Sequence, residues 1–330
     1  MALTISCAFA TSPQTPEHVQ LAEELGYSRA WFYDSPALLA DVWATMALAA
    51  QRTSTIQLAA GMLVPRMRHP MVTATAAAQV HQLAPGRVAI GIGSGFTGSV
   101  LLGQKPMRWQ DVEAYVDAVQ TLLAGGDVEW DGAMTRMCHP EGFVSPRPLR
   151  LPWVIAAEGP KGLEVARKHG DGIASALAEP PAGWDWVVKL TFGTVLDDGE
   201  PATSDRAFEA AGFGAAMAYH LYYEWKGEDA VRELPGGPEW LELVMRTEAP
   251  VRHFTVHDGH AVYVNDIERQ VMPRESVAAF TLTGSADELR SRLAEIEASG
   301  VTEIAYQPAG PDIPRELRAF ADMARPFTDR

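Results

Sequence analysis

The sequence predicts an α/β fold, a (β/α)8 TIM barrel with an insertion before the last strand. Short apolar runs recur along the chain, and most are too short for helices, which is typical of strands buried on both faces of a parallel sheet. Amphipathic segments follow many of them. Eight runs in 330 residues suit one barrel, with a doubly wound sheet as the alternative. The runs cover residues 3–9, 29–33, 56–62, 88–92, 153–157, 172–176, 187–195 and 303–307.

Helices with recognisable ends lie between these runs. Thr15 is expected to be the N-cap of one helix, with Pro16 at its first position and Gly26 just beyond its end. Residues 111–124 place apolar side chains at helical spacing, and residues 285–288 form a capping box. The alternation of strand and helix is what a barrel requires.

Two segments interrupt the alternation. Within residues 125–152, the Asp131–Gly132 pair predicts a hairpin turn. Residues 222–275 are longer than a βα loop should be. We therefore expect a single barrel domain over residues 1–330, in which residues 222–275 form a lid or a wall of the active site.

Composition excludes several classes of function. The net charge of −15 argues against nucleic acid or an anionic membrane as a partner. Cys7 and Cys138 show no metal-ligand or disulfide spacing. No apolar window reaches the ~20 residues of a membrane span, and the N-terminal residues do not resemble a signal peptide. These features predict a cytoplasmic protein.

The most informative segment follows the apolar run at 153–155. A helix that begins with Pro160 leaves the N–H groups of Lys161 and Gly162 free at the positive end of its dipole, and Lys161 adds a positive charge. This is a binding site for a phosphate or carboxylate group. The residues expected to form it are Ala157, Glu158, Gly159, Pro160, Lys161 and Gly162.

The carboxyl ends of barrel strands carry the active site, which identifies further candidates. These are Asp34 and Ser35 after the second strand, Gly61 and Met62 at the third, Gly93, Ser94 and Gly95 after the fourth, and Gln307 after the eighth. Asp34 is either a ligand at the barrel mouth or a helix cap. The glycines do not form a dinucleotide motif, because the acid at the required distance lies inside a helix; they would let a flat ring approach the backbone.

The histidines of the insertion do not predict a metal site. His257 and His260 lack the geometry of a zinc motif, and together with His253 they are expected to lie at the surface or in the lid.

A series of short motifs together indicates a family. They are LAEELGY at 21–27, WFYD at 31–34, IQLAAG at 56–61, RHP at 68–70, PGRVAIGIGSG at 85–95, AEGPK at 157–161, DG at 171–172 and TGS at 283–285. With its motifs in this order, the chain resembles the luciferase-like, flavin- or deazaflavin-dependent oxidoreductases. Within that family it resembles the branch of methylenetetrahydromethanopterin reductase and its deazaflavin-dependent relatives. The resemblance covers nearly the whole chain except residues 222–275.

The resemblance implies a homodimer and a cofactor at the carboxyl ends of the strands. The Gly-Pro-Lys turn matches the deazaflavin branch, which favours coenzyme F420 over FMN and places its phosphate at the helix start. Asp34 and the loop at 93–98 would contact its ring or ribityl chain. The resemblance also implies a non-prolyl cis peptide near Gly61–Met62. Many relatives carry His directly after the Asp of strand two, where this chain has Ser35.

Three functions follow as hypotheses. The first is an oxidoreductase that transfers a hydride between F420 and an organic substrate, with Asp34, Ser35 and Glu158 as acid–base candidates. The second is an FMN-dependent monooxygenase supplied with reduced flavin by a partner reductase. The third is a barrel that binds a flavin or deazaflavin without catalysis, which the Ser35 substitution keeps open.

Overall fold

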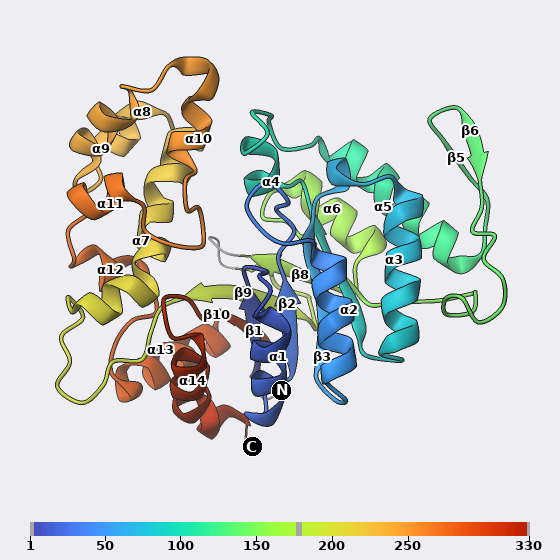
Figure 1. Cartoon of the computed structure of the whole chain (residues 1–330), viewed down its shortest axis with the longest axis horizontal. Coiled ribbons are helices and arrows are strands. Elements are labelled where there is room, and N and C mark those ends of the chain that lie inside the picture. The colour runs from blue at the N-terminus through green and yellow to red at the C-terminus, as the bar shows by residue number, and fades with distance from the viewer. Residues whose placement is uncertain (1–2, 176–179, 329–330) are drawn as a thin grey trace.

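The computed structural model describes residues 3–175 and 180–328, and in this part of the chain eight parallel strands close into a barrel (Figure 1). The predicted barrel is confirmed, and an open doubly wound sheet is excluded. The strands are β1 (Thr4–Phe9), β2 (Arg29–Phe32), β3 (Gln57–Leu63), β4 (Val88–Gly93), β7 (Trp153–Ala156), β8 (Gly172–Ser175), β9 (Val187–Phe192) and β10 (Glu303–Gln307), and their order around the barrel is β1-β10-β9-β8-β7-β4-β3-β2. Ala176, the predicted end of the sixth strand, lies outside the described residues.

Helices cover the outside of the barrel. They are α1 (Thr15–Glu24), α2 (Val42–Arg52), α3 (Pro70–Leu83), α4 (Phe96–Val100), α5 (Trp109–Ala124), α6 (Pro160–His169), α13 (Ala286–Ala298) and α14 (Ile313–Thr328), with the short helix η1 (Pro65–Met67) after β3. The capping box of Ser285 and Glu288 is present. The predicted N-cap of α1 is wrong by one residue. Gln14 is the N-cap, and the Thr15 hydroxyl instead accepts the N–H of Ser12 at 2.8 Å.

The predicted hairpin extends from the barrel beyond α5 (Figure 1). Strands β5 (Val128–Trp130) and β6 (Ala133–Thr135) pair antiparallel around Asp131 and Gly132. Both turn residues have positive φ, 51° and 77°, as a two-residue type I′ turn requires.

A polar cluster closes the amino end of the barrel interior. Glu303 is buried and accepts the indole N–H groups of Trp31 and Trp186, each at 2.8 Å, and it also pairs with Arg29. Around Trp31 the inward side chains of neighbouring strands are mostly small or aliphatic, such as Ala59. One large ring thus fills the barrel interior at this level.

Between β9 and β10 lies a helical segment beside the barrel (Figure 1). It contains α7 (Asp205–Trp225), α8 (Glu228–Arg232), α9 (Gly237–Val244), η2 (Ala249–Val251), α10 (Arg252–Val256), α11 (Asp266–Val271) and α12 (Ser276–Phe280). Apolar side chains of α7 and α9, with others from residues 256–277, form a core of their own, in which the ring of Tyr219 stacks on that of Trp240. Within the described residues, no helix combines the length and apolar character needed to cross a bilayer.

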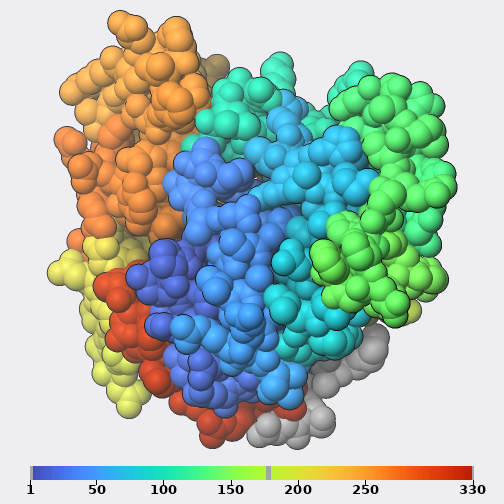
Figure 2. Space-filling model, turned by 45° about the vertical axis from the view of Figure 1, so that its right-hand side comes forward, coloured from blue at the N-terminus to red at the C-terminus, as the bar shows by residue number. Residues whose placement is uncertain are grey.

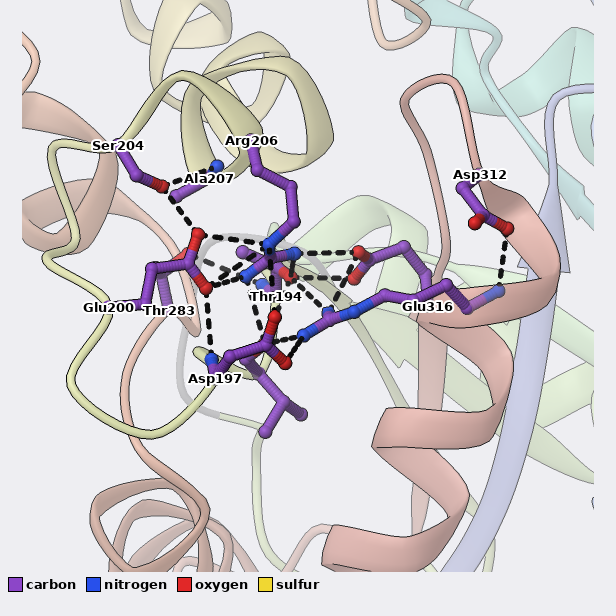
Figure 3. Close-up of polar contacts among 12 residues, drawn as sticks. Thr194, Asp197, Glu200, Ser204, Arg206, Ala207, Thr283, Asp312 and Glu316 are labelled. Atoms are coloured by element: carbon purple, nitrogen blue, oxygen red, sulfur yellow. Dashed lines mark hydrogen bonds and ion pairs between the residues drawn. The ribbon is translucent and has the colours of Figure 1, made fainter.

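A buried ion cluster fixes the start of α7 to the barrel (Figure 3). The Glu316 carboxylate accepts from Arg206 and Arg315, both at 2.9 Å, and from the Thr194 hydroxyl at 2.6 Å. Glu200 binds Arg206 from its other side. Since Glu316 and Thr194 are buried, this network holds α7, α14 and the loop after β9 in one arrangement.

Candidate active site

A cavity of about 460 Å³ lies at the carboxyl ends of the barrel strands, with the helical segment as one of its walls. Figure 2 shows the orange part of that segment next to the blue and teal segments of the barrel. The volume lies within the range of small-molecule sites. Of the predicted residues, those on the cavity wall are Asp34, Ser35, Gly61, Met62, Gly93, Ser94, Gly95, Glu158 and Gly159; Ala157, Pro160, Lys161 and Gly162 lie behind it or beside it.

The end of β3 forms one side of the cavity. The Gly61–Met62 peptide is cis, as the family resemblance implies, and the register between β3 and β4 shifts here. The Met62 side chain folds over Gly91 of β4, where a Cβ would lie 2.6 Å from the Met62 sulfur. A glycine at position 91 is therefore required for this close packing.

The loop after β4 brings bare backbone to the cavity. Gly95 has a φ of 77°, and a Cβ there would lie 2.3 Å from a methyl carbon of Val64. Any larger residue would be strained and would clash. Gly93 and Gly95 both line the cavity, and contact of their backbone with a flat ring stays a prediction.

Asp34 is buried and fully engaged by its neighbours. Both of its oxygens accept from Arg68, at 2.8 and 2.7 Å, and one also accepts the Val64 N–H at 3.2 Å. Burial raises the pKa of Asp34, while the Arg68 guanidinium opposes that rise. The Arg68 guanidinium also donates to the carboxylate of Asp41, the N-cap of α2. The arrangement suits positioning of the β3–α3 loop better than proton transfer.

The start of α6 is open, as its sequence predicts. Gly159 is the N-cap, it makes no side-chain cap, and a Cβ on it would meet nothing within 4 Å among the described residues. Pro160 and Lys161 are exposed, and Gly162 lies under Trp109, whose ring would be 2.5 Å from a Cβ there. Ala157 is buried beneath the turn. The start of the helix thus has no side-chain cap, and the Trp109 ring covers it at Gly162.

Glu158 is the ionisable group of the predicted set that is both exposed and on the cavity wall. Its carboxylate accepts the Ser175 hydroxyl at 2.8 Å, from the end of the neighbouring strand β8. Ser35 is buried beside Asp34, and its carbonyl accepts the N–H groups of Leu38 and Leu39.

Gln307 links the barrel to the opposite wall. Its amide oxygen accepts the Tyr33 hydroxyl at 2.8 Å, and its amide nitrogen donates to the carbonyl of Ala261 at 2.6 Å. Ala261 has a φ of 58°, an uncommon conformation for a residue with a Cβ, and it lines the cavity with Val262. A strand-end residue thus holds the loop at 260–262 in place.

Of the two positions expected for the histidines, the surface is wrong for two of the three, while all three lie in the predicted insertion. His257 and His260 are buried, and His260 lines the cavity; His253 is half-buried. Sequence analysis also missed the apolar wall residues, because nothing local in helix α7 distinguishes its cavity side from its core side. They include Met217, Leu221, Trp225, Phe192 and Trp109.

A closed parallel barrel with a small-molecule cavity at the carboxyl ends of its strands is the arrangement of a TIM-barrel enzyme. The family model described as luciferase-like monooxygenase matches residues 9–191, more than half of the chain. The chain therefore belongs to the luciferase-like monooxygenase family, a class of enzymes.

Two relatives with named activities are similar to this chain over most of its length. The 5,10-methylenetetrahydromethanopterin reductase of Archaeoglobus fulgidus is 27% identical over 323 residues, which cover 91% of each chain. An F420-dependent glucose-6-phosphate dehydrogenase of Microbacterium testaceum is 24% identical, covering 93% of this chain and 90% of its own. The solved coenzyme F420 dependent tetrahydromethanopterin reductase of Methanopyrus kandleri has the same fold, with a TM-score of 0.68, 19% identity and 99% of each chain covered.

Proposed function

We propose that the protein is a coenzyme F420-dependent oxidoreductase that transfers a hydride between the coenzyme and an organic substrate in the cavity. One observation carries the proposal: the cavity brings together the bulged end of β3, the glycine loop after β4 and the open start of α6. The names of the Archaeoglobus and Microbacterium relatives, which align over most of the chain, support this choice of reaction.

The residues present fit such a coenzyme. The N–H groups of Lys161 and Gly162 at the start of α6 would hold its phosphate, because they are free of side-chain caps and lie at the positive end of the helix dipole. Gly61, Met62 and the backbone at 93–95 would face its ring. When bound, the coenzyme supplies the hydride chemistry, while the protein supplies orientation and a dry cavity.

The chain's own residues would have three tasks. Apolar side chains of α7, such as Leu221, would exclude water, and the loop at 260–262 would shape the substrate side. Glu158 is the proposed proton holder, because Asp34 is committed to Arg68 and Ser35 does not titrate near neutral pH. We further propose a homodimer and assign residues 222–275 to the substrate wall.

A second candidate follows from the family description. An FMN-dependent monooxygenase, served by a separate flavin reductase, would use the same phosphate position at α6. A barrel that binds either cofactor without turning over is the third hypothesis.

Titration of the apoprotein with each cofactor tests the proposal. Trp31, Trp109 and Trp225 line the cavity, so cofactor binding should quench indole fluorescence. We expect saturable quenching by F420, and turnover of reduced or oxidised F420 with a panel of carbonyl, alcohol and alkene substrates. Tight FMN binding with no affinity for F420 would overturn the proposal, and stoichiometric F420 binding with no turnover would favour the non-catalytic barrel.

A further inference from the structure

Three buried histidines converge at the wall of the cavity, which His260 lines. His220 lies on α7, His257 caps the end of α10, and His260 follows in the next turn. Each offers a ring nitrogen, and the three nitrogens lie within 4.8 Å of one another. His220 comes from α7, while His257 and His260 come from the segment after α10. Apolar side chains of the helical segment also connect these two parts.

Carboxylates hold the outer nitrogens of two of these rings. His220 Nε2 lies 2.6 Å from Glu268 Oε1, and His257 Nε2 lies 3.1 Å from Glu224 Oε1. With both carboxylates ionised beside a bound cation, each would accept from Nε2, and each Nδ1 would present its lone pair to the cluster. A carboxylate behind a histidine is the usual outer contact of a metal-binding imidazole.

The three Nδ1 atoms cannot all form hydrogen bonds with one another. His220 Nδ1 and His260 Nδ1 are 2.7 Å apart, so one hydrogen between them serves both. His257 Nδ1 is buried and has no hydrogen-bond partner among residues 3–175 and 180–328. A buried lone pair without a donor is costly, and a cation at the centre of the cluster would accept all three.

The charge around the cluster favours a cation. The Glu268 carboxyl group lies 2.6 Å from His220. Asp258 and Glu224 add negative charge close to His220.

We propose that His220, His257 and His260 bind a divalent transition-metal ion through their Nδ1 atoms, and that Zn²⁺ matches this set of ligands best. Two nitrogens bound to one tetrahedral Zn²⁺ at about 2.0–2.1 Å lie about 3.4 Å apart. His260 must therefore move away from His220 by less than about 1 Å, and water fills the remaining position.

The bound ion would fix the cavity wall. His257 and His260 lie on either side of the turn that leads to Ala261 and Val262, and both of those residues line the cavity. The ring of Phe96, also on the cavity wall, lies 6.0 Å from His260 and 6.2 Å from His257. The ion would join this turn to α7, which provides the rest of that wall. This role does not depend on the identity of the cofactor.

Direct metal binding tests the proposal. Tag-free protein is stripped with a chelator and titrated with Co²⁺, whose visible absorption reports tetrahedral coordination, and then with Zn²⁺ as competitor. We expect about one ion per chain, loss of the Co²⁺ bands when Zn²⁺ is added, and slower amide exchange at residues 257–263 in the loaded protein. A chain that binds neither ion stoichiometrically would overturn the proposal.

Variants locate the site. His257→Gln should abolish the Co²⁺ bands, and Glu224→Gln, which keeps all three ligands, should weaken binding 10–100-fold. His253→Gln is the matched control in the same segment and should bind as the wild type does. If His257→Gln does not fold, the Co²⁺ spectrum of the wild type and the metal affinity of Glu224→Gln still test the proposal. Unchanged affinity in Glu224→Gln and His257→Gln would place any bound metal elsewhere and refute the assignment.

Discussion

The start of α6 can be blocked by one substitution that leaves the fold intact. In Gly159→Asp the new carboxylate would accept the N–H groups of Lys161 and Gly162, because an N-cap side chain bonds to the second and third residues of its helix. Asp41 already does this at α2, where it accepts from Trp43 and Ala44 at 3.0 and 2.9 Å. Gly159 has an ordinary φ of −98° and open space around its missing Cβ.

The magnitude follows from the contacts that the ligand would lose. Each hydrogen bond to a charged group contributes about 1.5 kcal/mol or more. Two such bonds correspond to about 3 kcal/mol, so affinity for F420 should fall on the order of 100-fold. The helix itself should be unaffected or slightly more stable, by a few tenths of a kcal/mol, so the melting temperature should not fall.

The assay compares two ligands and two variants. Binding is followed by indole fluorescence for F420 and for its ring-and-ribityl fragment, which lacks the phosphate. Gly159→Ala adds the Cβ without the charge and should bind both ligands normally. Gly159→Asp should lose affinity for F420 alone. Wild-type affinity for F420 in Gly159→Asp would show that the phosphate binds elsewhere.

Two further predictions concern stability. Glu303→Ala should lower the free energy of unfolding by about 3–5 kcal/mol in urea denaturation, because it leaves the Arg29 charge and two indole N–H groups without their acceptor; a loss below 1 kcal/mol would contradict this. Burial disfavours ionised Glu23, but hydrogen bonds from three backbone N–H groups just before β3 and from a neighbouring hydroxyl lower its pKa to about 2. The ionised Glu23 side chain therefore makes its full contribution to the free energy of unfolding above pH 4.5, and this contribution is lost as the pH falls toward 2. The difference in the free energy of unfolding between wild type and Glu23→Gln should shrink across that window and stay constant above it.

The barrel could be predicted because its strands are buried on both faces, and such strands appear in the sequence as short apolar runs whatever they pack against. The starts of α6 and α13 could be predicted for a similar reason, since proline, glycine and capping boxes act within a few residues. The cap of α1 was misplaced because the Thr15 hydroxyl bonds to Ser12 instead of the helix. The cis peptide came from family resemblance and not from any local signal.

The chemistry of the site depends on contacts that the sequence does not display. Asp34 looks like a free strand-end acid, but its partner Arg68 comes from the loop after the next strand. His257 lies next to Asp258 and Gly259 and so resembles a surface residue. The structure buries its side chain and places it against Glu224, which is distant in sequence. Neither the periodicity of apolar residues nor the spacing of motifs indicates the Asp34–Arg68 contact or the burial of His257.

The two sides of the cavity are held by different contacts, and under the proposed function this separates cofactor binding from substrate choice. The proposed cofactor side consists of strand ends and glycine loops whose backbone is fixed by the sheet. The opposite wall, at residues 217–225 and 260–262, is fixed by Gln307, by the Arg206–Glu316 pair and by the histidine cluster. Under the proposed function, a change of side chain at Val262 or Leu221 should therefore alter the substrates accepted while leaving the glycine loops and the start of α6 in place. The buried polar contacts behind that wall would hold its position when its surface side chains change.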